Sequence, residues 1–464
     1  MKKKLLATCL FFASNLGNSC FSQQLNSSTL QEVHPVCATQ APGEDWENWF
    51  QTKINEFKNS QLTKSNQASS LLYIPVVVHV IYKNGEASGS GSNLKAAQVQ
   101  AQIDALNDAM AGNAPGNSSL PAVFANVDAG ETNIRFCLAS KDKNGNTLSE
   151  AGIDRINWGN KGWSDPSTLG NNTTSYFDNT IKPNSIWDPT KYFNIWVADF
   201  LDANGAGLIG YATFPAGSGL SGMSGLGTGS SSTDGVVMAS RCFGCKAKFS
   251  NGYYSQNAYA YGITTVHEVG HWLGLRHISG DGQCGNDYCS DTPPQKGGNN
   301  GCSNGLNWGC PGYPFQANQC SGNSNGEMFQ NFMDYSDDQC RSLYTANQKT
   351  RMQTALNNGT YRTPLLNSTV CNTIDLDKIE QNTSILVYPN PTQHEITIQF
   401  DHALPNNNIH LKLTDMLGRT VKNEQVNVQG TLLHFTLNDL PVGMYYLNIN
   451  DGFKNIKNLV VVKQ

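Results

Sequence analysis

The sequence predicts an α+β fold for residues 67–365 and a small all-β sandwich for residues 385–464. In the first region, short apolar runs rich in β-branched residues occur alongside amphipathic helical segments. In the second, short alternating runs are punctuated by Gly and Pro, which is typical of a sandwich. A helical stretch over 260–275 carries two of three histidines that are spaced like metal ligands. A polar linker over 366–384 separates the two regions.

The N-terminus predicts a secretory signal peptide over residues 1–22, since lysines precede an apolar run that is too short to span a membrane. A lipoprotein anchor at Cys20 or Cys9 is the alternative. Residues 23–66 are polar and contain one weak helical stretch, 46–59, so we interpret them as a propeptide.

Residues 67–365 contain the following expected elements in order. A buried strand at 73–82 precedes an amphipathic helix at 96–110. Further strands are expected at 192–200 and 235–240. A last helix spans 345–359, with Thr345 as its N-cap and Gly359 near its end.

Composition excludes some classes of partner. Charged residues make up only 14% of the chain and the formal net charge is −5, which favours neither nucleic acid nor an anionic membrane surface. No segment after the signal peptide is long and apolar enough for a transmembrane span. Abundant Gly and Asn suit a loop-rich extracellular protein.

The segment "HEVGHWLGLRH" predicts a zinc site. His267 and His271 are four residues apart and therefore share one face of a helix. Gly274 can end that helix with a positive φ, so that the chain returns and brings His277 to the same ion. Three neutral imidazoles and one open position are what a catalytic Zn²⁺ requires.

Three further residues complete the expected chemistry. Glu268 lies between two of the ligands and can act as general base and acid. Met333 is expected in a tight turn below the metal, where its thioether makes a polarizable floor. Tyr335 is a candidate donor to the developing oxyanion, although a packed aromatic is the alternative.

These motifs resemble the metzincin metallopeptidases, and within them the pappalysin family. Supporting segments span much of residues 70–360, namely 73–82, 100–110, 134–146, 290–295 and 331–340. The resemblance implies a metzincin catalytic domain with a twisted sheet, backing helices and an active-site helix. It also implies an irregular, disulfide-rich lower half, with the substrate lying between the two halves.

The C-terminal motifs "YPNP", "LTDMLGR" and "LPVGMYYLNI" resemble the sorting domain of the type IX secretion system. That resemblance implies export through the periplasm of a Gram-negative bacterium and contact with the type IX machinery. A carbohydrate-binding or adhesive sandwich is the alternative.

Cysteines are numerous, as expected in an oxidising compartment. The disulfide candidates fall into a "CFGC" pair and a crowded loop: Cys242, Cys245, Cys284, Cys289, Cys302, Cys310, Cys320 and Cys340. The pair is expected to clip a local loop, and a second zinc site is the alternative for the crowded loop. By resemblance, Cys320 and Cys340 belong to different disulfides, with partners among Cys284, Cys302 and Cys310.

An acidic, glycine-rich loop at 280–293 suggests calcium. Asp281, Asp287 and Asp291 offer hard oxygen ligands, and the resemblance adds Thr292 of the "DTP" segment. A solvated acidic turn is the alternative.

Cys37 lies in the predicted propeptide, apart from the clustered cysteines. A thiolate could occupy the open zinc position, and zymogens of the family can be held latent in this way. The alternative is a disulfide to Cys137 or Cys371.

Asp338 stands five residues after Met333, in a segment expected to wall the pocket beside the metal. By resemblance, a carboxylate there favours Arg or Lys after the scissile bond. Asp337 and Asp334 are acidic neighbours that could take this role. The alternative to a specificity pocket is an exposed acidic turn with no role in substrate binding.

The sequence therefore predicts a secreted, zinc-dependent endopeptidase made as a latent zymogen, which cleaves proteins or peptides on the N-terminal side of Arg or Lys. The alternative is a surface adhesin with weak or no peptidase activity.

Overall fold

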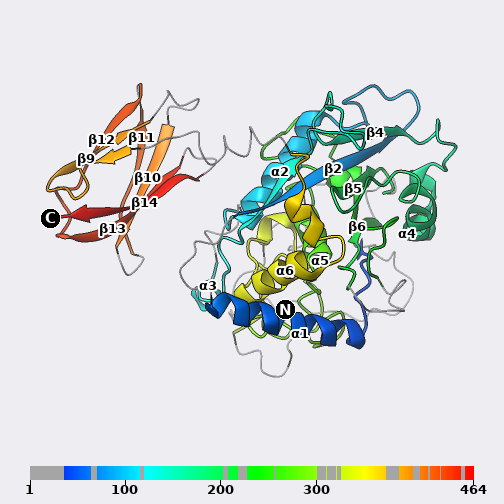
Figure 1. Cartoon of the computed structure of the whole chain (residues 1–464), viewed down its shortest axis with the longest axis horizontal. Helices are drawn as coiled ribbons and strands as arrows, with labels where there is room; N and C mark the ends of the chain where they lie inside the picture. Colours follow the sequence, from blue (N-terminus) through cyan, green and yellow to red (C-terminus); the bar gives the residue numbers. More distant parts are fainter. Residues whose placement is uncertain are drawn as a thin grey trace, which may run out of the picture. The chain divides into compact units, whose positions relative to one another are not determined.

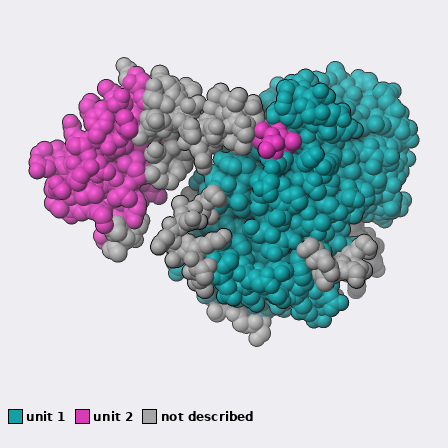
Figure 2. Space-filling view, in the orientation of Figure 1, with its two compact units in different colours: residues 1–368 teal, residues 369–464 magenta. Residues whose placement is uncertain are grey.

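The computed structural model describes two compact units, residues 1–368 and 369–464 (Figure 2). The residues described are 36–63, 71–114, 120–201, 207–217, 227–254, 258–299, 310, 320, 325–371, 386–400, 408–415, 419–428, 430–450 and 455–464. The predicted signal peptide, Cys302 and most of the predicted linker lie outside these residues. Within them, no helix has the length and apolarity that crossing a bilayer would require.

The first unit is built on a mixed seven-stranded sheet in the order β1-β6-β7-β5-β2-β3, with β4 also paired to β2 (Figure 1). Its strands are β1 (Val36–Cys37), β2 (Leu72–Tyr82), β3 (Ile134–Leu138), β4 (Ile153–Asn157), β5 (Phe193–Ala198), β6 (Leu208–Ala212) and β7 (Val236–Ala239). Strand β2 runs parallel to β3, β4 and β5, and its interior residues are all buried. Burial on both faces explains why β2 is a continuous apolar run rather than an alternating one.

The described part of the first unit also contains α-helices, some of which pack against the sheet (Figure 1). They are α1 (Glu44–Thr63), α2 (Ala96–Met110), α3 (Ala122–Ala125), α4 (Thr173–Tyr176), α5 (Ile263–Trp272) and α6 (Ala346–Asn358). Helices α2 and α5 contribute Val99, Leu106, Val266 and Val269 to one large core with β2 and β5. At the start of α6, Thr345 and Gln348 form a capping box, which confirms Thr345 as the N-cap.

The α+β prediction is confirmed, and the predicted strands and helices agree with β2, β5, β7, α2, α5 and α6 to within a few residues. The short strands β1, β3, β4 and β6 were not predicted. Strand β4 reads "IDRIN", which has neither an apolar run nor a clean alternation, and β6 reads "LIGYA", a short apolar run interrupted by Gly210.

Helix α1, the weak helical stretch of the predicted propeptide, packs against α6 of the catalytic unit. Trp46, Phe50 and Ile54 recur every four residues and are buried against Phe214 and Ala355. The described part of the predicted propeptide therefore folds as part of the first unit.

The second unit is all-β, which confirms the predicted sandwich. One sheet has the order β11-β10-β13-β14 and the other β12-β9-β8. The strands are β8 (Leu386–Tyr388), β9 (Glu395–Gln399), β10 (Asn408–Asp415), β11 (Thr420–Asn427), β12 (Leu432–Thr436), β13 (Gly443–Asn450) and β14 (Asn455–Lys463). Alternate residues of both sheets, such as Ile398, Leu411, Phe435 and Leu447, fill the core between them.

Disulfides join Cys284 to Cys320 and Cys310 to Cys340. Cys320 and Cys340 thus belong to different bridges, with partners from the expected set. The first bridge lies before Met333 in the sequence, and the second joins a residue before Met333 to one after it.

Three candidates prove to be buried free thiols instead: Cys242, Cys245 and Cys289. The clip within "CFGC" is not made because the two side chains point into different apolar clusters. Cys242 packs with Trp196 and Ala239, whereas Cys245 packs with Ala101 and Ala105 of α2.

Candidate active site

Helix α5 carries two of the three histidines through the centre of the first unit, and every one of its residues is buried. Its N-terminus is capped by a residue far away in the sequence, because Asp338 accepts hydrogen bonds from the backbone N–H groups of Tyr261 and Ile263 (3.0 and 3.2 Å). The helix ends at Trp272, and Gly274 just beyond its C-cap has a φ of +90° that reverses the chain. The return brings His277 beside His267 and His271.

Each imidazole is oriented by a hydrogen bond at Nδ1. His267 Nδ1 lies 2.8 Å from the Phe332 carbonyl oxygen, and His271 Nδ1 lies 2.7 Å from that of Leu275. His277 Nδ1 lies 2.5 Å from Asp281 Oδ1. Because these partners are acceptors, Nδ1 carries the proton and Nε2 presents a lone pair.

The three Nε2 atoms converge on one point. His271 Nε2 lies 3.1 Å from His267 Nε2 and 3.0 Å from His277 Nε2. Burial, together with the neighbouring imidazoles, lowers the pKa of His271 to about 3 and that of His267 well below its ordinary value, so both rings are neutral. Three acceptor atoms facing one another at this distance need a cation between them, which fits Zn²⁺.

Glu268 is fully buried beside this cluster. Its Oε2 accepts hydrogen bonds from Thr39 Oγ1 at 3.0 Å and Cys37 Sγ at 3.5 Å, while Oε1 has no partner among the described residues. Burial raises the pKa of Glu268 to about 7. Strand β6 can pass this close only because residue 210 is Gly, since a Cβ there would lie 2.9 Å from Glu268 Cγ.

Cys37 reaches the histidines from strand β1, which forms one edge of the sheet and pairs in parallel with β6. Its Sγ and one nitrogen of each of the three imidazoles all lie within 4.8 Å of one another, the only such group found among the described residues. Burial, followed by the nearby Glu268 carboxylate, raises the pKa of Cys37 well above its ordinary value without a metal. Cys37 is a free thiol, and Cys137 and Cys371 are each disulfide-bonded, so the alternative disulfide for Cys37 is wrong.

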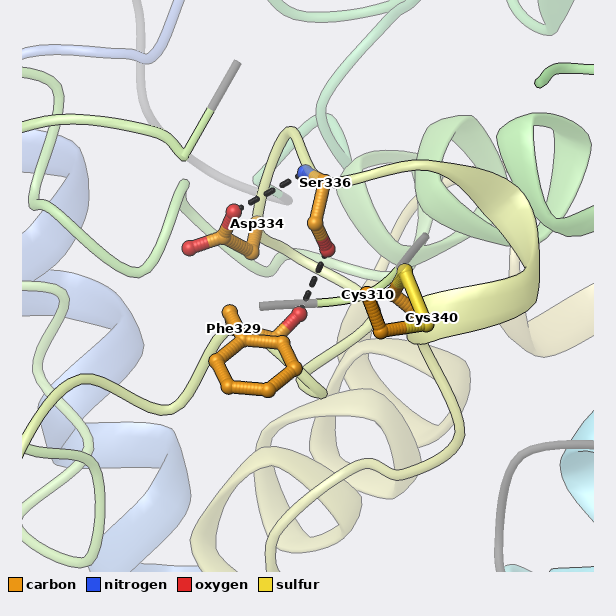
Figure 3. Close-up of a disulfide and its surroundings, with 5 residues drawn as sticks. All are labelled: Cys310, Phe329, Asp334, Ser336 and Cys340. Carbon is orange, nitrogen blue, oxygen red and sulfur yellow. Dashed lines mark hydrogen bonds between the residues drawn. A yellow bond between two sulfur atoms is a disulfide. The ribbon is translucent and has the colours of Figure 1, made fainter. Parts of the chain in front are cut away.

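Met333 lies under the active-site helix, fully buried. Its Sδ occupies the space where a Cβ on Gly270 would come within 2.4 Å. The turn that follows is held by Asp334, whose carboxylate accepts from the backbone N–H of Ser336 at 3.0 Å (Figure 3). Ser336 Oγ in turn donates to the Phe329 carbonyl oxygen at 2.5 Å, close to the disulfide between Cys310 and Cys340 (Figure 3).

This turn directs Tyr335 at the histidine cluster, with its Oη 2.8 Å from His277 Nε2. Burial raises the pKa of Tyr335 far above its ordinary value, so the phenol keeps its proton and can donate.

Four expected calcium ligands do not converge on one point. Asp281 binds His277 and Arg276, and Asp287 accepts from Thr292 Oγ1 at 2.8 Å. Asp291 accepts from Thr345 Oγ1 and the Asn347 backbone N–H at the start of α6. Each carboxylate therefore has a structural partner already.

Sequence reasoning missed two residues that touch the site. Thr39 hydrogen-bonds Glu268, and its place two residues after Cys37 in an extended segment could have shown that both side chains face the same way. Arg341 lies beside Thr264 and Asp338, and no motif pointed to it.

A buried three-imidazole site on a helix beneath a mixed sheet defines a metallopeptidase of the metzincin type. The family described as pregnancy-associated plasma protein-A matches residues 175–357, and the secretion system C-terminal sorting domain matches residues 386–463. The chain belongs to this pappalysin family of metallopeptidases and carries a type IX sorting domain.

Solved structures and sequence relatives agree with this assignment. The chain is similar to mature mirolysin of Tannerella forsythia in complex with a cleaved peptide, at 34% identity and a TM-score of 0.51, over 66% of this chain and 100% of that one. It is equally similar to a promirolysin mutant, at 34% identity and a TM-score of 0.51, over 69% and 93% of the two chains. An extracellular metalloprotease of Colletotrichum graminicola is 28% identical over 68% of this chain and 88% of that protein.

Proposed function

We propose that the chain is the latent precursor of a secreted zinc endopeptidase that hydrolyses peptide bonds in proteins. The observation that carries the proposal is the set of three inward-facing imidazole nitrogens beside the buried carboxylate of Glu268. Similarity to extracellular metalloproteases, and to mirolysin bound to a cleaved peptide, supports peptides as the substrate class. We also propose export through the periplasm of a Gram-negative bacterium by the type IX machinery, supported by the sorting domain.

His267, His271 and His277 would hold the zinc ion, which, when bound, polarises a carbonyl and lowers the pKa of a coordinated water. Glu268 takes a proton from the attacking water and gives it to the leaving amine, and a pKa near neutrality suits both transfers. Tyr335 donates a hydrogen bond to the oxyanion, because its protonated Oη already lies beside His277 Nε2.

Latency in this proposal comes from strand β1. Cys37 Sγ would fill the fourth position at the metal, since it belongs to the same group of ligand atoms as the three imidazoles. Thr39 Oγ1 also donates to Oε2 of Glu268, the atom that must accept the proton. Both the open position and the general base are thus engaged at once.

Of the two finer expectations, calcium stays a prediction, whereas a preference for Arg or Lys conflicts with the bonding of Asp338. Cleavage before Arg or Lys needs a free carboxylate at Asp338, and in the structure Asp338 is already bonded to Arg341 (2.7 Å). Structural calcium in the 280–293 loop rests only on the acidic residues of that sequence segment, because in the structure each of the three carboxylates already has a protein partner.

Replacing Glu268 by Ala tests the proposal directly. We expect the processed wild-type protein to hydrolyse casein, chelators to stop it, and Glu268→Ala to abolish hydrolysis while one zinc per chain is retained. Glu150→Ala, which removes a carboxylate from a partly exposed pair with Arg155, is the control and should stay active. A Glu268→Ala protein as active as wild type would disprove the assigned mechanism, and an inactive processed wild type would favour the adhesin.

A further inference from the structure

A small cavity lies beside Glu268 and is closed on one side by Cys37 of strand β1, so the departure of β1 would open it to a side chain next to the scissile bond. This role for the cavity rests on the proposed peptidase function. Among others, the cavity is lined by Ile209 of β6, Tyr259, Thr264, His267 and Glu268 of α5, and Arg341. The residue types in this wall decide which side chain the enzyme accepts.

Asp338, the residue expected to bind a cationic side chain, has no acceptor capacity left. Its Oδ2 accepts from the backbone N–H groups of Tyr261 and Ile263. Its Oδ1 accepts from Thr264 Oγ1 and Arg341 Nη2, both at 2.7 Å. A carboxylate offers about four lone-pair sites, and all are used here.

Arg341, in contrast, still has one hydrogen-bond donor without an acceptor. Nη1 faces the carbonyl oxygens of Phe332 (3.4 Å) and Asp334 (3.2 Å), and Nη2 faces Asp338 and Thr264. A guanidinium carries five N–H groups, and the remaining one, on Nε, has no partner among the described residues. Since the side chain is only 3% exposed, this N–H group is a buried donor without an acceptor, which is costly until one arrives.

The charges around the cavity also disfavour a cationic side chain. Arg341 and Asp338 form a fully buried ion pair, so together they offer a cationic side chain no net attraction. An entering Arg or Lys would lose its hydration and face the Arg341 guanidinium. Asp337 is half-buried nearby but is not among the residues that line the cavity.

We propose that Arg341 determines specificity by occupying the carboxylate that would otherwise bind a substrate cation. The pocket then disfavours Arg and Lys and selects a side chain with a hydrogen-bond acceptor, such as Gln, which can accept from Arg341 Nε. In this arrangement the enzyme's own arginine takes the place of a substrate arginine.

The test is a cleavage-site profile of the processed enzyme on a peptide library in which the residue after the scissile bond is varied. We expect Gln to be favoured and Arg and Lys to be depleted with the wild type. In Arg341→Met, which frees Asp338, kcat/KM for Arg relative to Gln should rise at least tenfold. The double variant Asp338→Asn with Arg341→Met should lose that gain.

Arg155→Met is the matched control, because it also removes an arginine paired to a carboxylate, Glu150, but away from the cavity; its profile should equal that of the wild type. A wild type that prefers Arg or Lys overturns the inference, as does an unchanged profile in Arg341→Met. If Arg341→Met does not fold, Arg341→Lys replaces it, and the depletion of Arg should then persist. Absence of any chelator-sensitive hydrolysis would instead contradict the proposed function.

Discussion

Glu47 anchors helix α1 to the catalytic unit, and replacing it by Ala should release that helix. Its carboxylate receives Arg351 Nη1 at 2.6 Å and Nη2 at 3.1 Å, and Arg276 Nε at 3.2 Å. Glu47 and Arg351 are each about 1% exposed. In Glu47→Ala, Arg351 would keep a buried charge without a carboxylate for as long as α1 stays docked.

The size of the effect can be worked from that geometry. Removing one partner of a buried ion pair costs about 3–5 kcal/mol, and undocking relieves the cost because the guanidinium reaches water. A loss of about 3 kcal/mol in docking free energy raises the undocked population roughly 100-fold.

Hydrogen exchange of the α1 amides, residues 44–63, measures this population directly. The assay uses a Glu268→Ala background, so that α1 is not removed by proteolysis. We expect exchange about 100-fold faster in Glu47→Ala, with the second unit unchanged as internal reference. Glu56→Ala, in the exposed pair with Lys53, should have almost no effect. An increase below tenfold in Glu47→Ala would refute the anchoring role.

The remaining predictions concern latency, pH, catalysis and calcium. Cys37→Ala should give a precursor that is active early and processes itself faster, whereas Cys289→Ala, which removes a buried free thiol elsewhere, should stay latent in a casein time course. Burial alone would raise the pKa of Glu47, but the hydrogen bonds and charge of Arg351 outweigh burial, so the pKa of Glu47 is lowered. The Glu47–Arg351 pair therefore contributes fully to the docking of α1 above about pH 4.3, and this contribution is lost as the pH falls further. Hydrogen exchange of the α1 amides at pH 3 and pH 6 checks this expectation. Tyr335→Phe should lower kcat by about 10²–10³ with little change in KM, as measured by steady-state kinetics. EGTA at zinc saturation should lower the melting temperature if the 280–293 loop binds calcium, and an unchanged value would remove that prediction.

The catalytic centre was predictable because its chemistry is encoded locally. The spacing of His267, His271 and Gly274 specifies a helix, its end and a return, and the structure contains that geometry. Strands such as β2 were predictable for a similar reason, since burial on both faces requires a continuous apolar run.

Long-range pairing could not be predicted in this way. The bonds from Asp338 to α5 and from Glu47 to Arg351 join residues 74 to 304 positions apart, and no local pattern specifies which acid meets which arginine. Free cysteines were mispredicted for the same reason, because whether Cys242 can reach Cys245 depends on which cluster each side chain enters.

The attachment of β1 to the same chain has a quantitative consequence for activation. While the backbone after β1 is intact, Cys37 is presented to the histidines at an effective concentration on the order of millimolar, whatever the dilution of the protein. A single cut on the C-terminal side of α1 turns the segment into a separate peptide that obeys mass action. Latency then becomes dependent on dilution: concentrated enzyme keeps rebinding the released peptide, whereas dilute enzyme loses it and stays active.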